Sequence, residues 1–274
     1  MEVHHLNCGS LCPRGGRMLS GKGSLLGKAH IVCHCLLVES SDGLVLIDTG
    51  FGTGDISDPN RLGQPFRALM RPELNESESA VSQVRAMGRD PADVRHIVVT
   101  HLDLDHAGGL SDFPQAKVHV FAPELEIAQN PPLPEKARYI QKQWAHGPDW
   151  VSHEVEGDTW FDFESVKPIP GLGDDVALVP LVGHTKGHSG VAVRGSDGWK
   201  LHCGDAYFFR GEVETPRRVT PGFRAFENVT QWKRGPRMRN LERLQELRRD
   251  HGSEVELFCS HDPETFDAHT HRAE

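Results

Sequence analysis

The sequence predicts an α/β protein, in which short strands outnumber helices. Short runs rich in β-branched and aliphatic residues recur along the chain, and each is closed by a polar cluster flanked by glycine. Two further segments carry apolar residues at helical spacing. The chain has 274 residues, of which 37% are hydrophobic and 25% charged, so it can bury a substantial core as one large domain or two small ones.

The first predicted strands form a hairpin. Residues 30–38 are mostly apolar and predict a strand, Ser41-Asp42-Gly43 predicts its turn, and residues 44–47 predict the returning strand. This second strand runs directly into Asp48-Thr49-Gly50. Residues 51–72, which are rich in glycine, proline and arginine, predict a long loop with at most a short helical stretch.

The rest of the chain predicts two helices and a series of short strands. Residues 77–87 form the first helix by the spacing of their apolar side chains, and residues 237–250 form the second, with leucines on one face. A buried strand over residues 94–100 ends at His101. The other predicted strands are residues 118–121, 177–182, 190–193, 199–202 and 255–259.

Composition restricts the partners and the cellular location. The formal charge of -9 argues against nucleic acid or an anionic membrane as the main partner. We expect no signal peptide, because no basic segment precedes an apolar run at the N-terminus, and no segment approaches membrane-spanning length. The six cysteines lack the spacing of a disulfide framework, and we interpret Cys33 and Cys35 as buried strand residues. A cytoplasmic protein is therefore expected.

The densest group of metal-ligand residue types follows the strand over residues 94–100. Four of them lie within six residues and alternate with leucines that we expect to anchor the loop in the core: His101, Asp103, Asp105 and His106. Ionised carboxylates at this density are costly to bury without a cation. The segment, which continues into Gly108-Gly109, therefore predicts a metal site at a strand-to-helix transition.

Three later strands also end in metal-ligand residue types. These ends are Gly183-His184-Thr185-Lys186-Gly187-His188, Gly204-Asp205-Ala206-Tyr207 and Ser260-His261-Asp262. A single histidine at a strand end is more often a hydrogen-bonded structural residue than a ligand. Together, however, the four segments predict one shared metal centre.

The order of these motifs resembles the metallo-β-lactamase superfamily. The family has five sequential motifs, and this chain matches them with Asp48 in DTG, HLDLDH at 101–106, His184, Asp205 and His261. The resemblance covers about residues 30–262 and is closest to the lactonase and glyoxalase II types, because of the chain length and the GHTxGH segment. It implies an αβ/βα four-layer sandwich, with two mixed β-sheets flanked by helices, as a single domain over residues 1–274.

The resemblance also implies a role for each residue. A first metal ion would be held by His101, Asp103 and His184, and a second by Asp105, His106 and His261, with Asp205 bridging both. Asp48 would orient a ligand without contacting a metal, and His188 matches no ligand position.

One ligand departs from the family pattern. The family has HxHxDH, whereas this chain has Asp103 in place of the second histidine. A carboxylate adds a negative charge and a harder oxygen donor. We expect two divalent metal ions, with zinc as the first choice and iron or manganese as alternatives because of Asp103. The flavodiiron oxidoreductases also carry a carboxylate here, but this chain is too short to contain their flavodoxin-like domain.

The resemblance implies a hydrolase that cleaves a small-molecule ester, above all a lactone or related acyl ester, by means of a metal-bridging hydroxide. Asp105 is the candidate to accept or relay a proton, and Tyr207 is the candidate donor to the oxyanion. Lactonases of this superfamily place such a tyrosine three residues after the bridging aspartate, where this chain has Phe208. Packing of the Tyr207 ring in the core is an equal alternative.

Specificity is expected to come from two loops. One covers residues 51–75, and the other is an insertion over residues 129–165, whose large side chains either form an apolar wall or cover the sheet: Trp144, His146, Trp150 and Trp160. The alternative functions are a phosphoester or organophosphate hydrolase, a non-haem iron oxidoreductase on the same fold, and a metal-binding protein with little catalysis. A nuclease fits the acidic charge less well.

Overall fold

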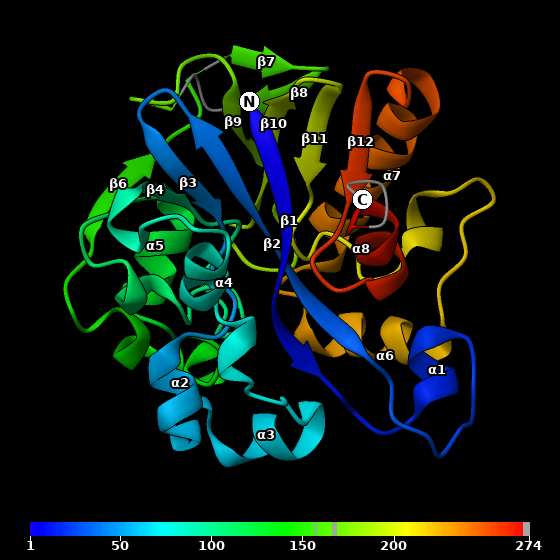
Figure 1. Cartoon of the computed structure of the whole chain (residues 1–274). Helices are drawn as coiled ribbons and strands as arrows, with labels where there is room; N and C mark the ends of the chain where they lie inside the picture. The colour runs from blue at the N-terminus through cyan, green and yellow to red at the C-terminus, as the bar shows by residue number, and fades with distance from the viewer. Residues whose placement is uncertain (157, 166–168, 271–274) are drawn as a thin grey trace.

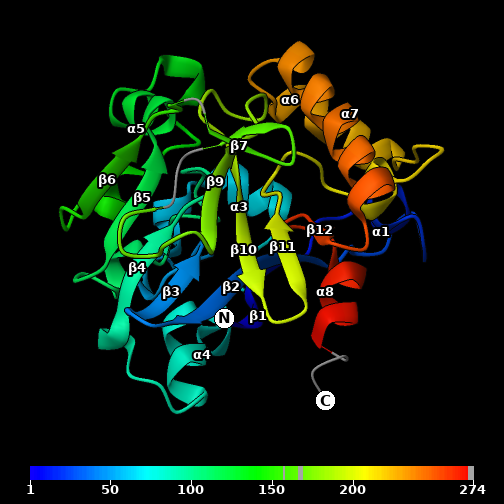
Figure 2. The ribbon, with the colours of Figure 1, turned by 90° about the horizontal axis from the view of Figure 1, so that it is seen from above.

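The molecule is a sandwich of two mixed β-sheets with helices on both outer sides (Figures 1 and 2). The computed structural model describes residues 1–156, 158–165 and 169–270. This arrangement confirms the αβ/βα four-layer fold that the sequence motifs imply.

The first sheet has the strand order β1-β2-β3-β4-β5-β6. Its first three strands pair antiparallel, and its last four pair parallel. The bounds are Glu2–Leu11 (β1), Ile31–Ser40 (β2), Gly43–Ile47 (β3), Val94–Val98 (β4), Lys117–Phe121 (β5) and Asp149–His153 (β6). Because β3 and β4 are parallel, the segments that follow them begin side by side at one edge of the sheet.

The second sheet has the order β12-β11-β10-β9, in which only β11 and β12 pair parallel. The bounds are Val176–Pro180 (β9), Ser189–Gly195 (β10), Gly198–His202 (β11) and Val255–Phe258 (β12). A small hairpin is formed by β7, Asp158–Trp160, and β8, Phe163–Ser165.

Helices cover the outer faces and one end of the sandwich (Figure 1). The α-helices are Gly16–Ser20 (α1), Thr53–Ser57 (α2), Gln64–Met70 (α3), Ala80–Ala86 (α4), Ala122–Gln129 (α5), Pro221–Thr230 (α6), Arg234–His251 (α7) and Pro263–Thr270 (α8). Short 3-10 helices are Pro59–Leu62 (η1), Glu76–Glu78 (η2), Pro91–Asp93 (η3), Leu110–Asp112 (η4), Leu133–Glu135 (η5), Gln141–Trp144 (η6) and Arg210–Val213 (η7). Capping residues begin some of them: Ser79 accepts from the backbone of α4, and Thr220 precedes a proline at the start of α6.

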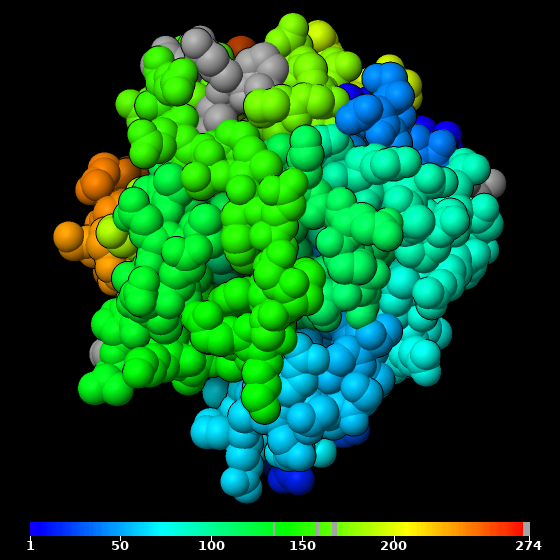
Figure 3. Space-filling model, turned by 90° about the vertical axis from the view of Figure 1, so that its left-hand side faces the viewer, coloured from blue at the N-terminus to red at the C-terminus, as the bar shows by residue number. Residues whose placement is uncertain are grey.

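Apolar side chains fill the space between the layers. Val45 and Val98 of the first sheet pack against Val191 of the second, so the inner core joins the two sheets. Outside, Val84 of α4 packs on the first sheet and Leu244 of α7 on the second. Figure 3 shows the outer side of the first sheet, where the green segment that includes α5 and β6 forms much of the surface.

The predicted strands and both predicted helices are present, but the sequence missed several elements. Strand β1 was missed because its histidines, asparagine and glycine hide any alternation. Residues 51–72 contain α2 and α3 and are not mainly a loop, and only η4, rather than an α-helix, follows the ligand-rich segment. All six cysteines are free and buried, as expected. Within the described residues, no helix combines the length and the apolarity needed to cross a bilayer.

Candidate metal centre

Seven side chains predicted as metal ligands meet at one edge of the sandwich. Strands β4, β9, β11 and β12 all end at this edge, and the segments that follow them supply the side chains. The loop after β4 carries His101, Asp103, Asp105 and His106, and the segments after the other three strands carry His184, Asp205 and His261.

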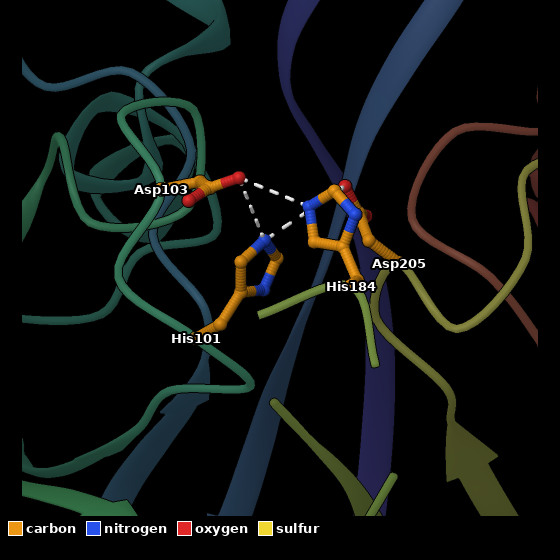
Figure 4. A group of neighbouring side chains, drawn as sticks. All are labelled: His101, Asp103, His184 and Asp205. Carbon is orange, nitrogen blue, oxygen red and sulfur yellow. Dashed lines mark hydrogen bonds and ion pairs between the residues drawn. The ribbon is translucent and has the colours of Figure 1, made fainter. Parts of the chain in front are cut away.

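The first group consists of His101, Asp103, His184 and Asp205, whose donor atoms all lie within 4.8 Å of one another (Figure 4). Asp103 Oδ2 lies 3.0 Å from His184 Nε2 and 3.5 Å from His101 Nε2. Asp205 Oδ2 lies 3.4 Å from His184 Nε2 and 3.8 Å from His101 Nε2. Two imidazole nitrogens and two carboxylate oxygens therefore face a common point, which is a donor set that divalent transition metals accept.

The second group contains His106, Asp205 and His261, with Asp105 beside them. Asp205 Oδ1 lies 3.4 Å from His106 Nε2 and 3.2 Å from His261 Nε2. Asp105 Oδ2 lies 3.7 Å from His261 Nε2. Because Oδ2 of Asp205 faces the first group and Oδ1 faces the second, this carboxylate is placed to bridge two cations.

Several donor atoms at this centre are buried without a hydrogen-bond partner in the described structure. They include His101 Nε2, His106 Nε2, Asp103 Oδ1 and Asp205 Oδ1. Buried polar atoms are normally satisfied, and the exceptions call for an explanation such as an ion. The donor types, their spacing and these orphaned atoms all fit divalent cations. We propose the seven residues as the metal ligands on these grounds.

In His101, His106 and His261, the Nδ1 atom contacts a partner outside the centre, so that Nε2 is directed at the centre. His106 Nδ1 lies 2.8 Å from Asp48 Oδ2, and His261 Nδ1 lies 2.8 Å from the carbonyl oxygen of Val32. His101 Nδ1 lies 2.9 Å from Thr100 Oγ1. Asp48 thus holds the ring of His106 from outside the centre, which is the position that the sequence predicts for it.

His188 also lies outside the ligand groups, as predicted. Its Nε2 accepts a hydrogen bond of 2.8 Å from the backbone N–H of Asp205, and its Nδ1 donates to the carbonyl oxygen of Leu181 at 3.0 Å. The ring therefore holds the backbone of the bridging carboxylate in place.

The glycines after the ligand-rich segment permit close packing of two loops. A Cβ added to Gly108 would lie 2.6 Å from the carbonyl oxygen of Gly50 and 2.9 Å from the backbone nitrogen of Gly52. A side chain at position 108 would therefore push the loop after β4 away from the loop after β3, which carries Asp48.

Electrostatics at the centre favour ionised carboxylates. Burial raises the pKa of Asp205, but the rings of His261 and His106 hold it well below its usual range. Burial likewise raises the pKa of Asp103, but the guanidinium of Arg138 and the ring of His101 hold it well below its usual range. Burial lowers the pKa of His106, but Asp205 and Asp48 raise it well above its ordinary value, so a cation must displace a proton from this ring.

Two residues that the sequence analysis missed hold this edge together. Glu124 is buried at the start of α5 and accepts from the backbone N–H of Leu102 at 3.0 Å, from Thr185 Oγ1 at 2.6 Å and from the backbone N–H of Gly187 at 3.1 Å. Arg138 forms an ion pair with Asp103 at 3.1 Å. Nothing in the sequence distinguishes either residue from a surface charge, because their partners are distant in the chain.

Cys33 has a position that the sequence did not suggest. It is buried in β2, as predicted, but its sulfur lies within 4.8 Å of donor atoms of Asp105 and His261. The strand that carries it passes beneath the second group, and the Cys33-His34-Cys35 segment gives no sign of this, because Asp105 and His261 are distant in the chain.

A cavity of about 800 Å³ opens onto the centre and is lined mainly by apolar side chains. Ligand residues Asp103, Asp105, His184, Asp205 and His261 form its polar end. Its apolar walls come mostly from α1, α3 and α6 and include Met18, Phe66, Leu69, Phe223, Phe226 and Val229. The predicted contribution of residues 51–75 is therefore present, whereas the contributions of α1 and α6 were not foreseen.

The tryptophans of the insertion over residues 129–165 do not form the cavity wall. Trp144 and Trp150 pack with the core of the first sheet, and Trp160 packs with that of the second. His146 does not line the cavity either, and among the described residues of the insertion those that do are Glu135, Ala137 and Arg138. The interpretation that the tryptophans cover the sheets is the correct one for the described part of the insertion.

Tyr207 lies in the core and not in the cavity. Only 1% of its surface is exposed, and its ring packs with the apolar cluster beneath α7. Phe208 lines the cavity instead, and its ring stacks on His261 at a centroid distance of 5.4 Å. The structure thus favours the packing interpretation of Tyr207 over the role of oxyanion donor.

Comparisons with known proteins agree with this fold. The family model described as the metallo-beta-lactamase superfamily matches residues 31–251. The chain is 44% identical to the probable metallo-hydrolase Rv2300c of Mycobacterium tuberculosis over 267 residues, which cover 97% of this chain and 82% of the relative. It is 30% identical over 232 residues to the N-acyl homoserine lactonase AttM of Azorhizobium caulinodans, covering 84% of this chain and 81% of that protein.

Solved structures show the same fold. A crystal structure of a mutant of B. thuringiensis AiiA with N-decanoyl-L-homoserine at its active site aligns with a TM-score of 0.73 at 19% identity, covering 97% of this chain and 95% of that chain. At this identity the match supports the fold alone. The family match, the sandwich and the gathered His and Asp side chains lead to one conclusion: the chain belongs to the metallo-β-lactamase superfamily, and it is a metal-dependent hydrolase.

Proposed function

We propose that this enzyme hydrolyses lactones that carry an apolar acyl chain, with N-acyl homoserine lactones as the leading substrate class. The observation that carries the proposal is the apolar cavity of about 800 Å³ that ends on the candidate metal centre. A lactone ring at the polar end would meet the ligand residues, while its acyl chain would lie against the aromatic and aliphatic wall.

Zinc is the proposed metal, with iron or manganese as alternatives because Asp103 offers an oxygen donor. Two bound divalent ions would supply a strongly acidified water and a positive charge against the carbonyl oxygen of the ester. The residues of the chain would orient these groups: Asp205 fixes the two ligand groups relative to each other, and Asp48 fixes the ring of His106.

Asp105 is the proposed proton acceptor. Its carboxylate lines the cavity and belongs to the second ligand group, so it lies beside the place where an ester carbonyl would react. It can take the proton released on attack and return it to the leaving alkoxide when the ring opens. Tyr207 is buried away from the cavity, so we assign the oxyanion no tyrosine donor.

The names of relatives support this substrate class. The AttM relatives are N-acyl homoserine lactonases, and the AiiA structure holds an N-acyl homoserine at its active site. The 44% identical relative is named a probable metallo-hydrolase, a name that specifies no substrate.

The experiment measures hydrolysis across three substrate classes with and without metal. Purified protein is treated with chelator, reloaded with zinc, manganese or iron, and its metal content is determined by mass spectrometry. We expect opening of N-acyl homoserine lactones that depends on the metal, with slower turnover of thioesters and phosphotriesters. Preferential turnover of phosphotriesters would overturn the lactone proposal in favour of an organophosphate hydrolase.

Substitution of Asp105 tests its role within the same assay. We expect Asp105→Asn to lower the rate of lactone opening by roughly 100-fold or more, the range that general acid–base groups contribute. Asp42→Asn is the matched control, because Asp42 is exposed and its carboxylate contacts His96 far from the cavity. An unchanged rate in Asp105→Asn would remove this residue from the mechanism.

A further inference from the structure

We infer that Arg138 is a positioning residue of the metal centre, and that it allows an aspartate to serve where the family motif has a histidine. This inference rests on the proposed metal centre. It does not depend on which ester the enzyme cleaves.

The guanidinium of Arg138 joins three segments around the first ligand group. Its Nε lies 3.1 Å from Asp103 Oδ1, one terminal nitrogen donates to the carbonyl oxygen of His184 at 3.0 Å, and the other donates to the carbonyl oxygen of Thr230 at 2.6 Å. The loop after β4, the turn after β9 and the end of α6 are therefore held by one side chain. Two of these three partners are residues of the first ligand group.

The two oxygens of Asp103 have different surroundings. Oδ1 faces Arg138 Nε. Oδ2 faces His184 Nε2 at 3.0 Å and His101 Nε2 at 3.5 Å (Figure 4). The Asp103 side chain is only 13% exposed, and that of Arg138 only 15%. The contact of Oδ1 with Arg138 is an ion pair without a well-aligned hydrogen bond. With the guanidinium charge beside Oδ1, Oδ2 is the oxygen left to bind the cation. Arg138 thus selects one oxygen and one orientation of the ligand.

The charges at the first ligand group also support a pairing of Arg138 with Asp103. In the family pattern, the residue at this place is a neutral imidazole, whereas Asp103 adds one negative charge to those of Asp105 and Asp205. The guanidinium of Arg138 offsets this charge at contact distance. An arginine keeps its charge at every relevant pH and presents its donors in a fixed plane, so it is suited to a lasting pairing with a buried carboxylate. The ion pair of Asp103 and Arg138 therefore has no net charge and leaves Asp103 Oδ2 directed at the first ligand group.

A pairing of this kind predicts opposite effects of one substitution in two backgrounds. In the wild-type background, Arg138→Met releases Oδ1, and we expect the weaker of the bound ions to dissociate roughly 10- to 100-fold more readily, as on loss of other groups that orient ligands. In an Asp103→His background, the ion pair is lost, and the guanidinium keeps only its hydrogen bonds to the carbonyl oxygens of His184 and Thr230 while its charge repels the cation. There we expect Arg138→Met to strengthen metal binding by at least about tenfold.

Metal affinity is measured by competition with a chromogenic chelator, together with metal stoichiometry and the visible spectrum of the cobalt-loaded proteins. Arg243→Met is the matched control, since Arg243 also donates to a backbone carbonyl, that of Asp162, but lies on α7 outside the cavity. We expect it to leave metal affinity unchanged. Unfolding of each metal-free variant is recorded so that loss of folding is recognised.

The outcomes separate the two proposals. A wild-type protein that binds no divalent ion overturns the metal centre itself. Wild-type binding combined with the same effect of Arg138→Met in both backgrounds overturns the role of Arg138 and leaves the centre intact. If Arg138→Met does not fold, Arg138→Lys replaces it, because lysine keeps the positive charge but lacks the planar guanidinium. Metal binding should then weaken with Asp103 present. It should not improve in the Asp103→His background.

Discussion

At the scale of single residues, the centre is held by buried polar groups that each have defined partners. Asp48 is 1% exposed and accepts hydrogen bonds from the backbone N–H and the hydroxyl of Thr100, both at 2.7 Å, besides its contact with His106. Its backbone has a φ of 58°, in the left-handed region that aspartate tolerates better than most residues. Such a conformation costs on the order of 1–3 kcal/mol and persists where the surroundings impose it.

The role of Asp48 as an orienting residue can be tested by Asp48→Asn. The side chain keeps its shape but loses the charge that pairs with His106, so we expect metal affinity to fall roughly 10- to 100-fold. Competition with a chelator measures this directly. Affinity equal to that of the wild type would show that the ring of His106 is oriented without the Asp48 charge.

At the scale of elements, loops from distant parts of the chain are joined by single buried carboxylates. Glu124 at the start of α5 links the ligand-rich loop after β4 to the turn after β9. Two further buried carboxylates, Glu212 of η7 and Glu227 of α6, form ion pairs with arginines. Arg217 lies 2.6 Å from Glu212. Arg237 of α7 lies 3.2 Å from Glu227. The pairing of Arg237 with Glu227 fixes α6, an element that borders the cavity.

Removal of the Glu124 carboxylate should loosen two ligand segments at once. Glu124→Ala leaves the donors of Leu102, Thr185 and Gly187 without their buried acceptor, and each unsatisfied group costs about 1–3 kcal/mol. We expect the free energy of unfolding in urea to fall by about 3 kcal/mol or more. Glu126→Ala, at an exposed position on the same helix, should change it by less than about 0.5 kcal/mol.

The pair of Glu212 and Glu227 predicts a pH dependence of stability. Burial and the neighbouring Glu212 raise the pKa of Glu227 to about 8. The folded protein therefore keeps a proton on Glu227 at pH values above 4.5, the ordinary pKa at which the unfolded chain releases it. The contribution of Glu227 to the free energy of unfolding is thus complete below pH 4.5 and is lost as the pH rises toward 8.

Urea unfolding at a series of pH values checks this sign. In the wild type, we expect on the order of 3 kcal/mol of stability to be lost between pH 5 and pH 8 through this group. Glu227→Gln should flatten that part of the profile, whereas Glu242→Gln, at an exposed position on α7, should not. A profile of Glu227→Gln parallel to that of the wild type would contradict the assignment.

At the scale of the whole molecule, the sandwich positions the cavity between elements that are far apart in sequence. The ligand residues lie at the ends of strands from both sheets, and the apolar walls come from α1, α3 and α6. Leu69 and Val229, at 64% and 85% exposed, continue the apolar surface outward from the cavity. A substrate with a long acyl chain can therefore bury more apolar surface here than a short one.

The cavity predicts a dependence on acyl-chain length. Each methylene removed from water contributes up to about 0.8 kcal/mol, so kcat/KM should rise up to about fourfold per methylene until the chain fills the cavity. Kinetics with N-acyl homoserine lactones from butanoyl to dodecanoyl test this. Phe226→Ala should lower kcat/KM for the longest chains and leave the shortest unchanged. Equal values across the series would show that the acyl chain does not occupy the apolar wall.

The single domain over residues 1–274 stays a prediction. The inner core joins both sheets through residues such as Val98 and Val191, so we expect one cooperative unfolding transition for the apo protein. Two separate transitions followed by near-ultraviolet and far-ultraviolet circular dichroism would argue for two domains.

Local sequence was sufficient for the parts of the protein whose signal is contained in short segments. Strands β2 to β4 are short apolar runs, and metal-ligand residue types stand directly after several strands. The order of these motifs resembles the metallo-β-lactamase superfamily, and that resemblance implied both the fold and the seven candidate ligands. Tertiary structure decided the rest, because the contacts involved join residues far apart in the chain. Arg138 lies 35 residues after Asp103, and Cys33 lies 72 residues before Asp105. The packing of the sandwich likewise determines the cavity walls from α1 and α6, the burial of Tyr207 and the contacts of Glu124. The spacing of motifs along the chain does not predict this packing.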